Sequence, residues 1–175
     1  MDRAKKMNNN LVVLKFGGTS VANVKHWQAI AEIISKRINE GFKPLVVLSA
    51  LCGVSAVLAK VLKVPTNAMC AKAVEDIKRQ HLDLAKAMGL DGANFLQSYF
   101  NDLSSLLEEV SSTDKVSPLL NAKVMSLGEL MVTTLGSTWL RGHKLFSGKV
   151  AVNWKDARLL LVSKKQENKS EHSQI

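Results

Sequence analysis

The sequence predicts an α/β fold built on parallel strands. Residues 11–14 and 45–48 form two continuous apolar runs, and apolar residues recur at helical spacing between them. A strand, helix, strand order of this kind gives parallel strands joined by a right-handed crossover. We expect the first strand to be buried on both faces, because its apolar run does not alternate with polar residues. Ligands of such sheets gather at the carboxyl ends of the strands.

The first strand ends in Lys15, and Gly17 and Gly18 follow it directly. A lysine at a strand exit, beside glycine backbone and ahead of a helix, can hold an anionic phosphate. We expect Thr19 and Ser20 to cap the helix that follows.

Four further helices are predicted by apolar spacing and by their ends. One opens at Gly53 and stops before Pro65, one covers about 68–88, one carries the apolar residues of 95–110, and one begins at Ser117–Pro118. His81 lies within an apolar helix face. We interpret it as a packed, hydrogen-bonded core residue rather than a ligand, because no second ligand marks a site there.

The sequence pattern after the last predicted helix is no longer helical. Leu145 and Phe146 are predicted to be extended, and residues 150–154 alternate as a strand does. Asp156 and Arg158 are interpreted as structural, loop-ordering residues. We expect a polar N-terminal extension over 1–10, one domain over 11–162 and a disordered polar tail over 163–175.

The composition of the chain disfavours several classes of function. The 24 Lys and Arg residues against 15 Asp and Glu residues give a net charge of +9, but they are scattered without an aromatic stripe, which disfavours nucleic-acid binding. Cys52 and Cys70 show no metal or disulfide spacing, so buried free thiols are expected. No apolar run has the length of a membrane span and no signal-peptide core is present, so we expect a cytoplasmic, non-membrane protein.

The two common nucleotide-binding loops, GxxxxGK[ST] and GxGxxG, are absent. The candidate chemistry therefore rests on one cation, several donors and one carboxylate: Lys15, Gly17, Gly18, Thr19, Ser20, Ser49, Ser55 and Glu129. Such a set suits a small zwitterion and a transferring phosphoryl group. Gly128, a mid-helix glycine beside Glu129, indicates close approach of another backbone or a ligand. An exposed helical glutamate without a ligand is the alternative for Glu129.

The segment Lys-Phe-Gly-Gly-Thr-Ser-Val-Ala at 15–22 resembles the opening signature of aspartate kinases, in the amino-acid kinase superfamily. Segments 48–55, 126–129 and 154–158 agree with the family in the same order. The last is similar to the kinase portion of bifunctional aspartate kinase and diaminopimelate decarboxylase proteins. The resemblance covers about 11–160 and implies an incomplete three-layer α/β/α amino-acid kinase fold, of which this chain holds the N-terminal lobe.

The resemblance implies ATP-dependent phosphorylation of the β-carboxylate of L-aspartate, in amino-acid biosynthesis, with ATP and Mg²⁺ as cofactors. Lys15 would act as the catalytic contact to the transferring phosphates, with Gly17, Gly18, Thr19 and Ser20 forming the phosphate-binding turn. Ser49, Ser55 and Glu129 would bind aspartate, Glu129 through the substrate ammonium. No residue is assigned to a metal.

The sequence also departs from the family pattern. Ser55 is usually threonine and Ala56 usually asparagine, and family members continue past residue 160 with most of the nucleotide pocket. We therefore expect a truncated chain that is inactive alone, exposes a hydrophobic sheet edge, and forms a homo-oligomer or needs a partner chain. A non-catalytic aspartate-binding, phosphate-binding or assembly fragment is the alternative. Kinases of glutamate or acetylglutamate are disfavoured by the Thr-Ser-Val-Ala and Ser-x-Gly-Glu segments.

Overall fold

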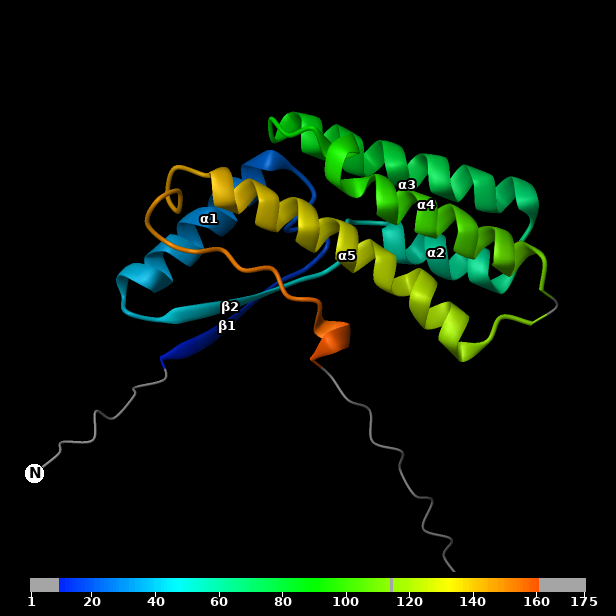
Figure 1. Ribbon diagram of the computed structural model, residues 1–175, viewed down its shortest axis with the longest axis horizontal. Helices are drawn as coiled ribbons and strands as arrows, with labels where there is room; N and C mark the ends of the chain where they lie inside the picture. The colour runs from blue at the N-terminus through cyan, green and yellow to red at the C-terminus, as the bar shows by residue number, and fades with distance from the viewer. Residues whose placement is uncertain (1–9, 114, 161–175) are drawn as a thin grey trace, which may run out of the picture.

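The computed structural model describes residues 10–113 and 115–160 as two parallel strands under a group of helices (Figure 1). The elements are β1 (Leu11–Phe16), α1 (Val24–Asn39), β2 (Lys43–Leu48), α2 (Val54–Lys63), α3 (Asn67–Ala87), α4 (Gly92–Ser111), α5 (Pro118–Gly142) and the short 3₁₀ helix η1 (Ala157–Leu159). The helices and strands predicted up to α5 are all confirmed. Residues 1–9 and 161–175, which hold most of the predicted extension and tail, lie outside the described residues.

β1 and β2 pair in parallel, with Leu11 opposite Lys43 and Phe16 opposite Leu48. The Lys43 N–H donates to the Asn10 carbonyl at 2.7 Å, so the pairing begins one residue before the predicted domain boundary. The predicted strand, helix, strand unit with parallel strands is therefore present, and its carboxyl edge carries the segments that follow Phe16 and Leu48.

The prediction that β1 is buried on both faces is wrong. Exposure alternates along both strands, and the outer face leaves Leu11, Val13, Leu45 and Val47 exposed at 56, 59, 50 and 43 %. The reason is that all five α-helices lie on one side of the sheet (Figure 1), where α1 and α5 contact β2. A continuous apolar run implies two covering layers, and the described residues supply one.

α5 is the central helix of the core. Its buried face includes Leu127, Met131 and Leu135, and it packs against α2, α3 and α4. A Cβ added at Gly136 would overlap the indole of Trp27, so glycine is required at that crossing. The Trp27 indole N–H donates to the Val21 carbonyl at 3.0 Å, which satisfies the polar atom of this fully buried ring.

His81 is a core residue, as predicted. Its side chain is 0 % exposed, and its Nδ1 hydrogen-bonds the Ile77 carbonyl one turn earlier at 2.8 Å. Nε2 has no hydrogen-bond partner among the described residues. Burial lowers the pKa of His81 below its usual range, so the neutral ring is favoured.

The segment after α5 differs from the prediction. Residues 145–146 belong to a turn rather than an extended segment, since the Phe146 N–H donates to the His143 carbonyl. Residues 151–156 have no regular secondary structure, so the predicted strand over 150–154 is absent from the described part of the chain. Side chains of α5 hold the segment instead: Arg141 donates to the Val152 carbonyl and Trp154 donates to Thr133, both at 3.0 Å.

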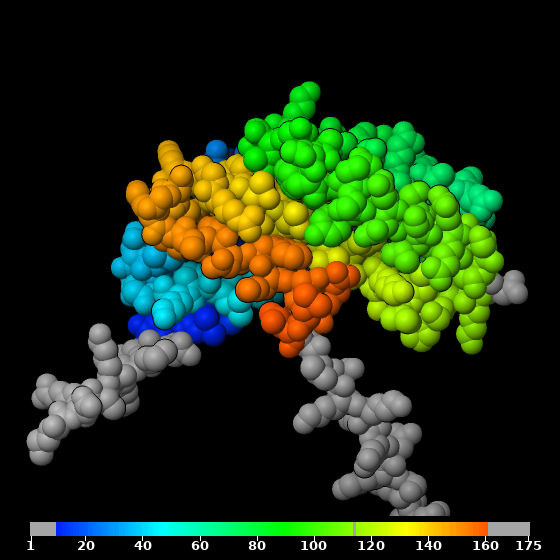
Figure 2. All heavy atoms as spheres, viewed as in Figure 1, coloured from blue at the N-terminus to red at the C-terminus, as the bar shows by residue number. Residues whose placement is uncertain are grey.

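The space-filling view shows this orange segment lying between the blue-to-cyan part of the chain and the yellow-to-green helices (Figure 2). A cavity of about 600 Å³ lies beneath it, lined by α1, β2, α5 and residues 150–155. Among the described residues, no helix is both long enough and apolar enough to cross a membrane.

Candidate functional site

The turn after β1 is fixed by α1. The Ser20 N–H donates to the Gly17 carbonyl at 3.0 Å, and the His26 ring hydrogen-bonds the Thr19 carbonyl at 2.9 Å. Asn23 rather than Thr19 or Ser20 caps α1, accepting from the His26 N–H at 3.0 Å, so the predicted cap is wrong. Asn23 takes the role because the turn occupies Gly17–Ser20, which delays the helix to Val24.

Gly18 packs against the loop that follows β2. A Cβ at Gly18 would lie 2.8 Å from the Ala50 carbonyl oxygen and 3.3 Å from the Cys52 nitrogen. Only glycine lets these two backbones come this close. The turn predicted to hold phosphate therefore touches the loop that carries Ser49.

Gly128 approaches the same loop from α5. A Cβ at Gly128 would lie 2.9 Å from the Ala50 Cβ and 3.2 Å from Val54 Cγ1. The close approach indicated by a mid-helix glycine is thus confirmed. Ala50 is contacted from two sides, so the turn after β1, the loop after β2 and the Glu129 turn of α5 meet at one place.

The candidate side chains around Ala50 have few internal partners. Lys15 is exposed, and its Nζ lies 3.7 Å from the position that a Gly17 Cβ would take, so the ammonium folds toward the turn. Ser49, Ser55 and Glu129 are half-buried. Within the described residues, neither the two serine hydroxyls nor the Glu129 carboxylate forms a side-chain hydrogen bond or an ion pair, which leaves these groups available to a ligand.

The beginning of α2 adds backbone donors to this place. Gly53, in a left-handed conformation with φ of 86°, precedes the helix and offers no side-chain cap. The first turn, which contains Ser55, has no acidic residue. The Val54 N–H donates to the Leu51 carbonyl, but the Ser55 and Ala56 N–H groups donate to no residue in the described part of the chain. These two donors and the positive end of the helix dipole favour an anion at the start of α2.

Two residues that position this site were not singled out from the sequence. The Gln80 side-chain amide of α3 donates to the Cys52 carbonyl at 3.0 Å and so holds the loop after β2. Thr133 donates to the Glu129 carbonyl at 2.8 Å while accepting from Trp154. A surface glutamine on a helix carries no sequence signal, whereas Thr133 follows Glu129 at i+4, a spacing that places both residues on one helix face.

Asp156 and Arg158 lie in η1 and pair with each other. The Asp156 carboxylate accepts from the Arg158 backbone N–H at 2.9 Å and forms an ion pair with its guanidinium at 2.7 Å. The side-chain hydrogen bond from Arg158 lowers the pKa of Asp156. The Asp156 carboxylate and the Arg158 guanidinium therefore bond each other at η1, in agreement with a loop-ordering role.

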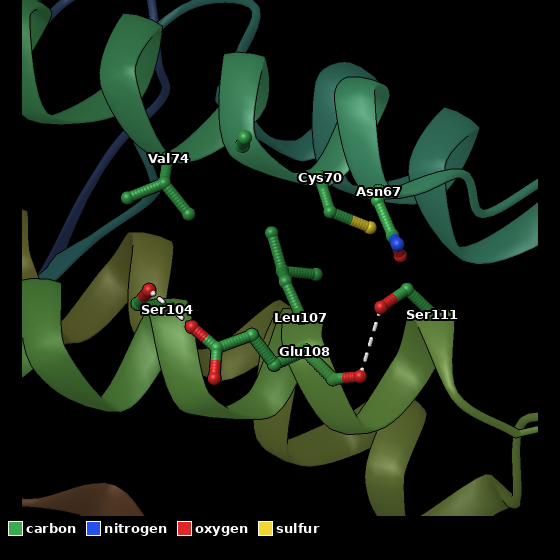
Figure 3. A pocket seen from close by; sticks show the side chains of 8 residues that line it. Asn67, Cys70, Val74, Ser104, Leu107, Glu108 and Ser111 are labelled. Atoms are coloured by element: carbon green, nitrogen blue, oxygen red, sulfur yellow. Dashed lines mark hydrogen bonds between the residues drawn. The ribbon is translucent and has the colours of Figure 1, made fainter.

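Neither of two cavities in the molecule is lined by Lys15, Ser49, Ser55 or Glu129. The smaller one, about 280 Å³, lies between α3 and α4 beside Cys70 and Glu108 (Figure 3). Burial raises the pKa of the Cys70 thiol, which favours the unreactive protonated form. In residues 10–113 and 115–160, no group of three or more His, Cys, Asp or Glu residues could hold a metal ion.

Comparison with known proteins identifies the family. The profile of the amino acid kinase family matches residues 10–171. The chain belongs to the amino acid kinase family. Its partial α/β fold with parallel strands is the one that the sequence predicted.

Relatives of this amino acid kinase chain are aspartokinases. It is 30 % identical over 143 residues to chloroplastic aspartokinase 2 of Arabidopsis thaliana, a match over 75 % of this chain and 25 % of that protein. It is 31 % identical over 128 residues to the aspartokinase of Chlamydia trachomatis, covering 71 % of this chain and 26 % of the relative. The chain thus spans about a quarter of the length of these curated relatives.

Solved structures agree with this relationship. E. coli aspartokinase III in complex with aspartate and ADP superposes with a TM-score of 0.66 at 27 % identity, over 75 % of this chain and 29 % of that chain. The same enzyme in complex with lysine and aspartate gives a TM-score of 0.65 at 28 % identity, with the same coverage.

Proposed function

We propose that this chain carries the aspartate-binding and phosphate-contacting part of an aspartokinase site. The observation that carries the proposal is the contact of Gly18 and Gly128 with the Ala50 loop, which gathers the predicted segments at one edge of the sheet. The similarity to aspartokinases supports the choice of substrate.

Aspartate offers one ammonium and two carboxylates, and the candidate site offers matching groups. Glu129 binds the ammonium, because it is a half-buried carboxylate with no cationic partner among the described residues. Ser49, Ser55 and the uncapped beginning of α2 bind a carboxylate through hydroxyl and N–H donors.

The turn after β1 holds the phosphoryl group. The Gly18 and Thr19 N–H groups donate to no other residue in the described part of the chain, and Lys15 adds a positive charge beside them, while the Thr19 and Ser20 hydroxyls flank the turn. In the proposed reaction, ATP supplies the phosphoryl group: a β-carboxylate oxygen of aspartate bonds to the γ-phosphorus, the bond to ADP breaks, and aspartyl phosphate forms. Lys15 and the amides stabilise the charge that develops during transfer.

The open setting of these groups favours aspartate binding by this chain over turnover by it. Lys15 and Thr19 are exposed, and neither cavity described above encloses them. An enclosed site that excludes water strengthens the electrostatic stabilisation on which phosphoryl transfer depends. We therefore propose that the chain alone binds aspartate without turning over ATP, as the alternative of a binding fragment predicts.

Calorimetry with the purified chain tests the binding proposal. Glu129→Gln removes the charge and keeps the shape, and we expect aspartate affinity to fall about tenfold or more. Glu109→Gln, an exposed glutamate on α4, is the matched control and should bind aspartate as the unchanged chain does. Equal affinity of the Glu129→Gln and unchanged chains would refute the role of Glu129.

A coupled assay of ADP release tests the proposal that the chain alone does not turn over ATP. No aspartate-dependent release is expected from the chain alone, and measurable release would reject the binding-only form while keeping the aspartokinase assignment. Titration with glutamate and acetylglutamate checks the substrate class. Tighter binding of either compound than of aspartate would exclude aspartate as the substrate.

A further inference from the structure

We propose that the cavity beneath residues 150–155 binds a monocarboxylate with an aliphatic chain of medium length, such as decanoate. Residues 150–155, called the covering segment, lie over a cavity of about 600 Å³ that α1, β2 and α5 also line (Figure 2). Ser49, Ser55 and Glu129 are not among its lining residues. The proposal therefore concerns a second site and does not depend on the proposed aspartokinase function.

The size and the walls of the cavity are those of a small-molecule site. Ligand pockets typically measure about 300–1,000 Å³ and have mainly apolar walls with a few polar groups that orient the ligand. Most side chains that line this cavity are aliphatic or aromatic. Its most buried apolar side chains are those of Ile34, Leu140 and Phe146, which are 6, 6 and 2 % exposed. An aliphatic chain that enters the cavity leaves water, and each buried methylene adds to the affinity.

The polar side chains of the α5 wall already have partners. The Ser137 hydroxyl donates to the Thr134 carbonyl at 3.0 Å. The Thr133 hydroxyl donates to the Glu129 carbonyl at 2.8 Å and accepts from the Trp154 indole at 3.0 Å. Neither hydroxyl keeps a free donor, so a carboxylate placed against α5 would be buried without hydrogen bonds from them. The aliphatic chain of the ligand therefore lies against α5.

The β2 wall, in contrast, offers unpaired donors. The Lys43 and Ser49 N–H groups donate to β1 at 2.7 and 3.1 Å, and a strand directs alternate residues to opposite neighbours. The Val46 and Leu48 N–H groups therefore point to the other edge of β2, where no strand pairs in the described part of the chain. Both residues line the cavity. A carboxylate can accept hydrogen bonds from such N–H groups.

The charges around the cavity select an anion. Lys43 and Lys155 line it, both are exposed, and neither forms an ion pair among the described residues. Among the described residues that line the cavity, none is Asp or Glu. A lysine side chain is long and flexible, so its ammonium can reach a carboxylate at the mouth of the cavity. A cationic amphiphile would meet like charges there.

The covering segment can open to admit a ligand. Residues 151–155 have no regular secondary structure and form no backbone–backbone hydrogen bond in the described part of the chain. Two side-chain hydrogen bonds hold the segment, from Arg141 to the Val152 carbonyl and from Trp154 to Thr133, both at 3.0 Å. A segment with so few bonds opens locally without unfolding the core.

Calorimetry with the full chain tests the ligand class, with every amphiphile kept below its micelle concentration. Decanoate should bind at one site, at least about tenfold more tightly than hexanoate, because hexanoate has fewer methylenes to bury. Decyltrimethylammonium, with the same chain and the opposite charge, should bind at least about tenfold more weakly than decanoate. Higher salt should weaken decanoate binding.

NMR of the methyl groups locates the bound decanoate. The signals of Val46 and Leu140, which line the cavity, should shift on binding. The signals of Leu119, an exposed leucine at the start of α5, should not shift.

Ser137→Leu fills the cavity from α5 and should lower decanoate affinity about tenfold or more. Thr138→Leu is the matched control, because both hydroxyls donate to the Thr134 carbonyl but Thr138 does not line the cavity. It should keep decanoate affinity within about twofold. The urea midpoint of Ser137→Leu should not fall, because the added methyl groups occupy empty space. A loss of binding without a loss of stability separates a filled site from a damaged fold.

A second pair of variants tests the charges. Lys43→Gln with Lys155→Gln should weaken decanoate binding several-fold and leave the binding of decanol, the uncharged analogue, unchanged. Lys60→Gln, an exposed lysine of α2 that does not line the cavity, should alter neither.

Equal affinity for decanoate and decyltrimethylammonium would overturn the proposal, because charge would then not select the ligand. An absence of decanoate binding, or unchanged binding by Ser137→Leu, would also reject it. Tighter binding of a valine-rich peptide than of decanoate would instead make the β2 edge a site for a peptide strand. If Ser137→Leu fails to fold by circular dichroism, the methyl signals of the unchanged chain decide: no shift at Val46 and Leu140 refutes the site.

Discussion

Gly128 on α5 and Ala50 in the loop after β2 are in such close contact that a Cβ on the glycine would come within 2.9 Å of the Ala50 Cβ. The contact joins two segments 78 positions apart in the numbering, so the glycine aligns the Glu129 turn with Ser49 and Ser55. The mid-helix glycine, which costs about 1 kcal/mol of helix propensity, is retained by this contact.

Gly128→Ala should lower both stability and aspartate affinity. The added methyl pushes on Ala50 and Val54, and overpacking of this kind costs about 1–3 kcal/mol, partly offset by the better helix propensity of alanine. Urea unfolding and aspartate calorimetry measure the two effects. Ala50→Gly in the Gly128→Ala background should restore part of both, and a failure to do so would show that the Ala50 contact is not the cause.

The control for this substitution lies on the same helix. Gly142 ends α5, and a Cβ there would meet no atom within 4 Å. Gly142→Ala should therefore leave the urea midpoint within about 0.5 kcal/mol of the unchanged chain and leave aspartate binding intact.

Gly136→Ala should be more damaging than Gly128→Ala. Its methyl would overlap the indole of Trp27, a side chain that is fully buried and tied to Val21. A rigid ring in a packed core cannot move aside as a flexible chain end can, so we expect a loss of about 3 kcal/mol or more. Thermal unfolding followed by tryptophan fluorescence measures it, and a stability equal to that of Gly142→Ala would contradict the packing described.

The buried ring of His81 should make stability fall in mild acid. The unfolded chain takes up a proton near the ordinary pKa of 6.5, whereas burial lowers the pKa of the folded state. Stability is therefore full above pH 6.5 and declines as pH drops from 6.5 toward the lower folded pKa, by at most about 1.4 kcal/mol per pH unit.

Urea midpoints of the unchanged chain and of His81→Gln at pH 7.5 and 5.0 isolate this effect. The loss between the two pH values should be smaller in His81→Gln. His143, whose pKa burial also lowers, contributes with the same sign and remains in both proteins. An identical loss in both would exclude His81 as the titrating group.

Gln80→Ala should weaken aspartate binding with little effect on stability. The substitution removes the 3.0 Å hydrogen bond to the Cys52 carbonyl, which lies in an exposed loop where water can replace the lost donor. The free energy of unfolding should therefore change little, while the loop after β2 becomes less ordered. We expect a several-fold loss of aspartate affinity by calorimetry. Gln97→Ala, which removes a glutamine bonded to Asn101 on the surface of α4, should leave affinity unchanged.

The strands, the helices and the Gly128 contact could be predicted, because each of these predictions rests on residues that are close together in the sequence. The apolar runs gave the strands, helical spacing gave the helices, and Gly128 beside Glu129 indicated the contact with the loop after β2. The exposure of Val13 and Leu45 could not be predicted, because an apolar run does not reveal whether a second layer lies above it.

The remaining errors concern long-range partners. The alternation at residues 150–154 predicted a strand wrongly, because hydrogen bonds from Arg141 to the Val152 carbonyl and from Trp154 to Thr133 hold this segment against α5 instead of in a sheet. Gln80 resembles any surface glutamine until the loop after β2 folds beside it. Such residues are recognised only once the tertiary contacts are known.

The hydrogen bond from Trp154 to Thr133 makes Trp154 an intrinsic fluorescence reporter of the candidate site. Thr133 also bonds the Glu129 carbonyl, so the half-buried Trp154 indole is two hydrogen bonds from the backbone of the candidate ammonium-binding residue. Trp27, fully enclosed in the core, provides an internal reference emission. A ligand bound at Glu129 should therefore shift the emission wavelength of Trp154, which allows ligand binding to be followed in the unlabelled chain.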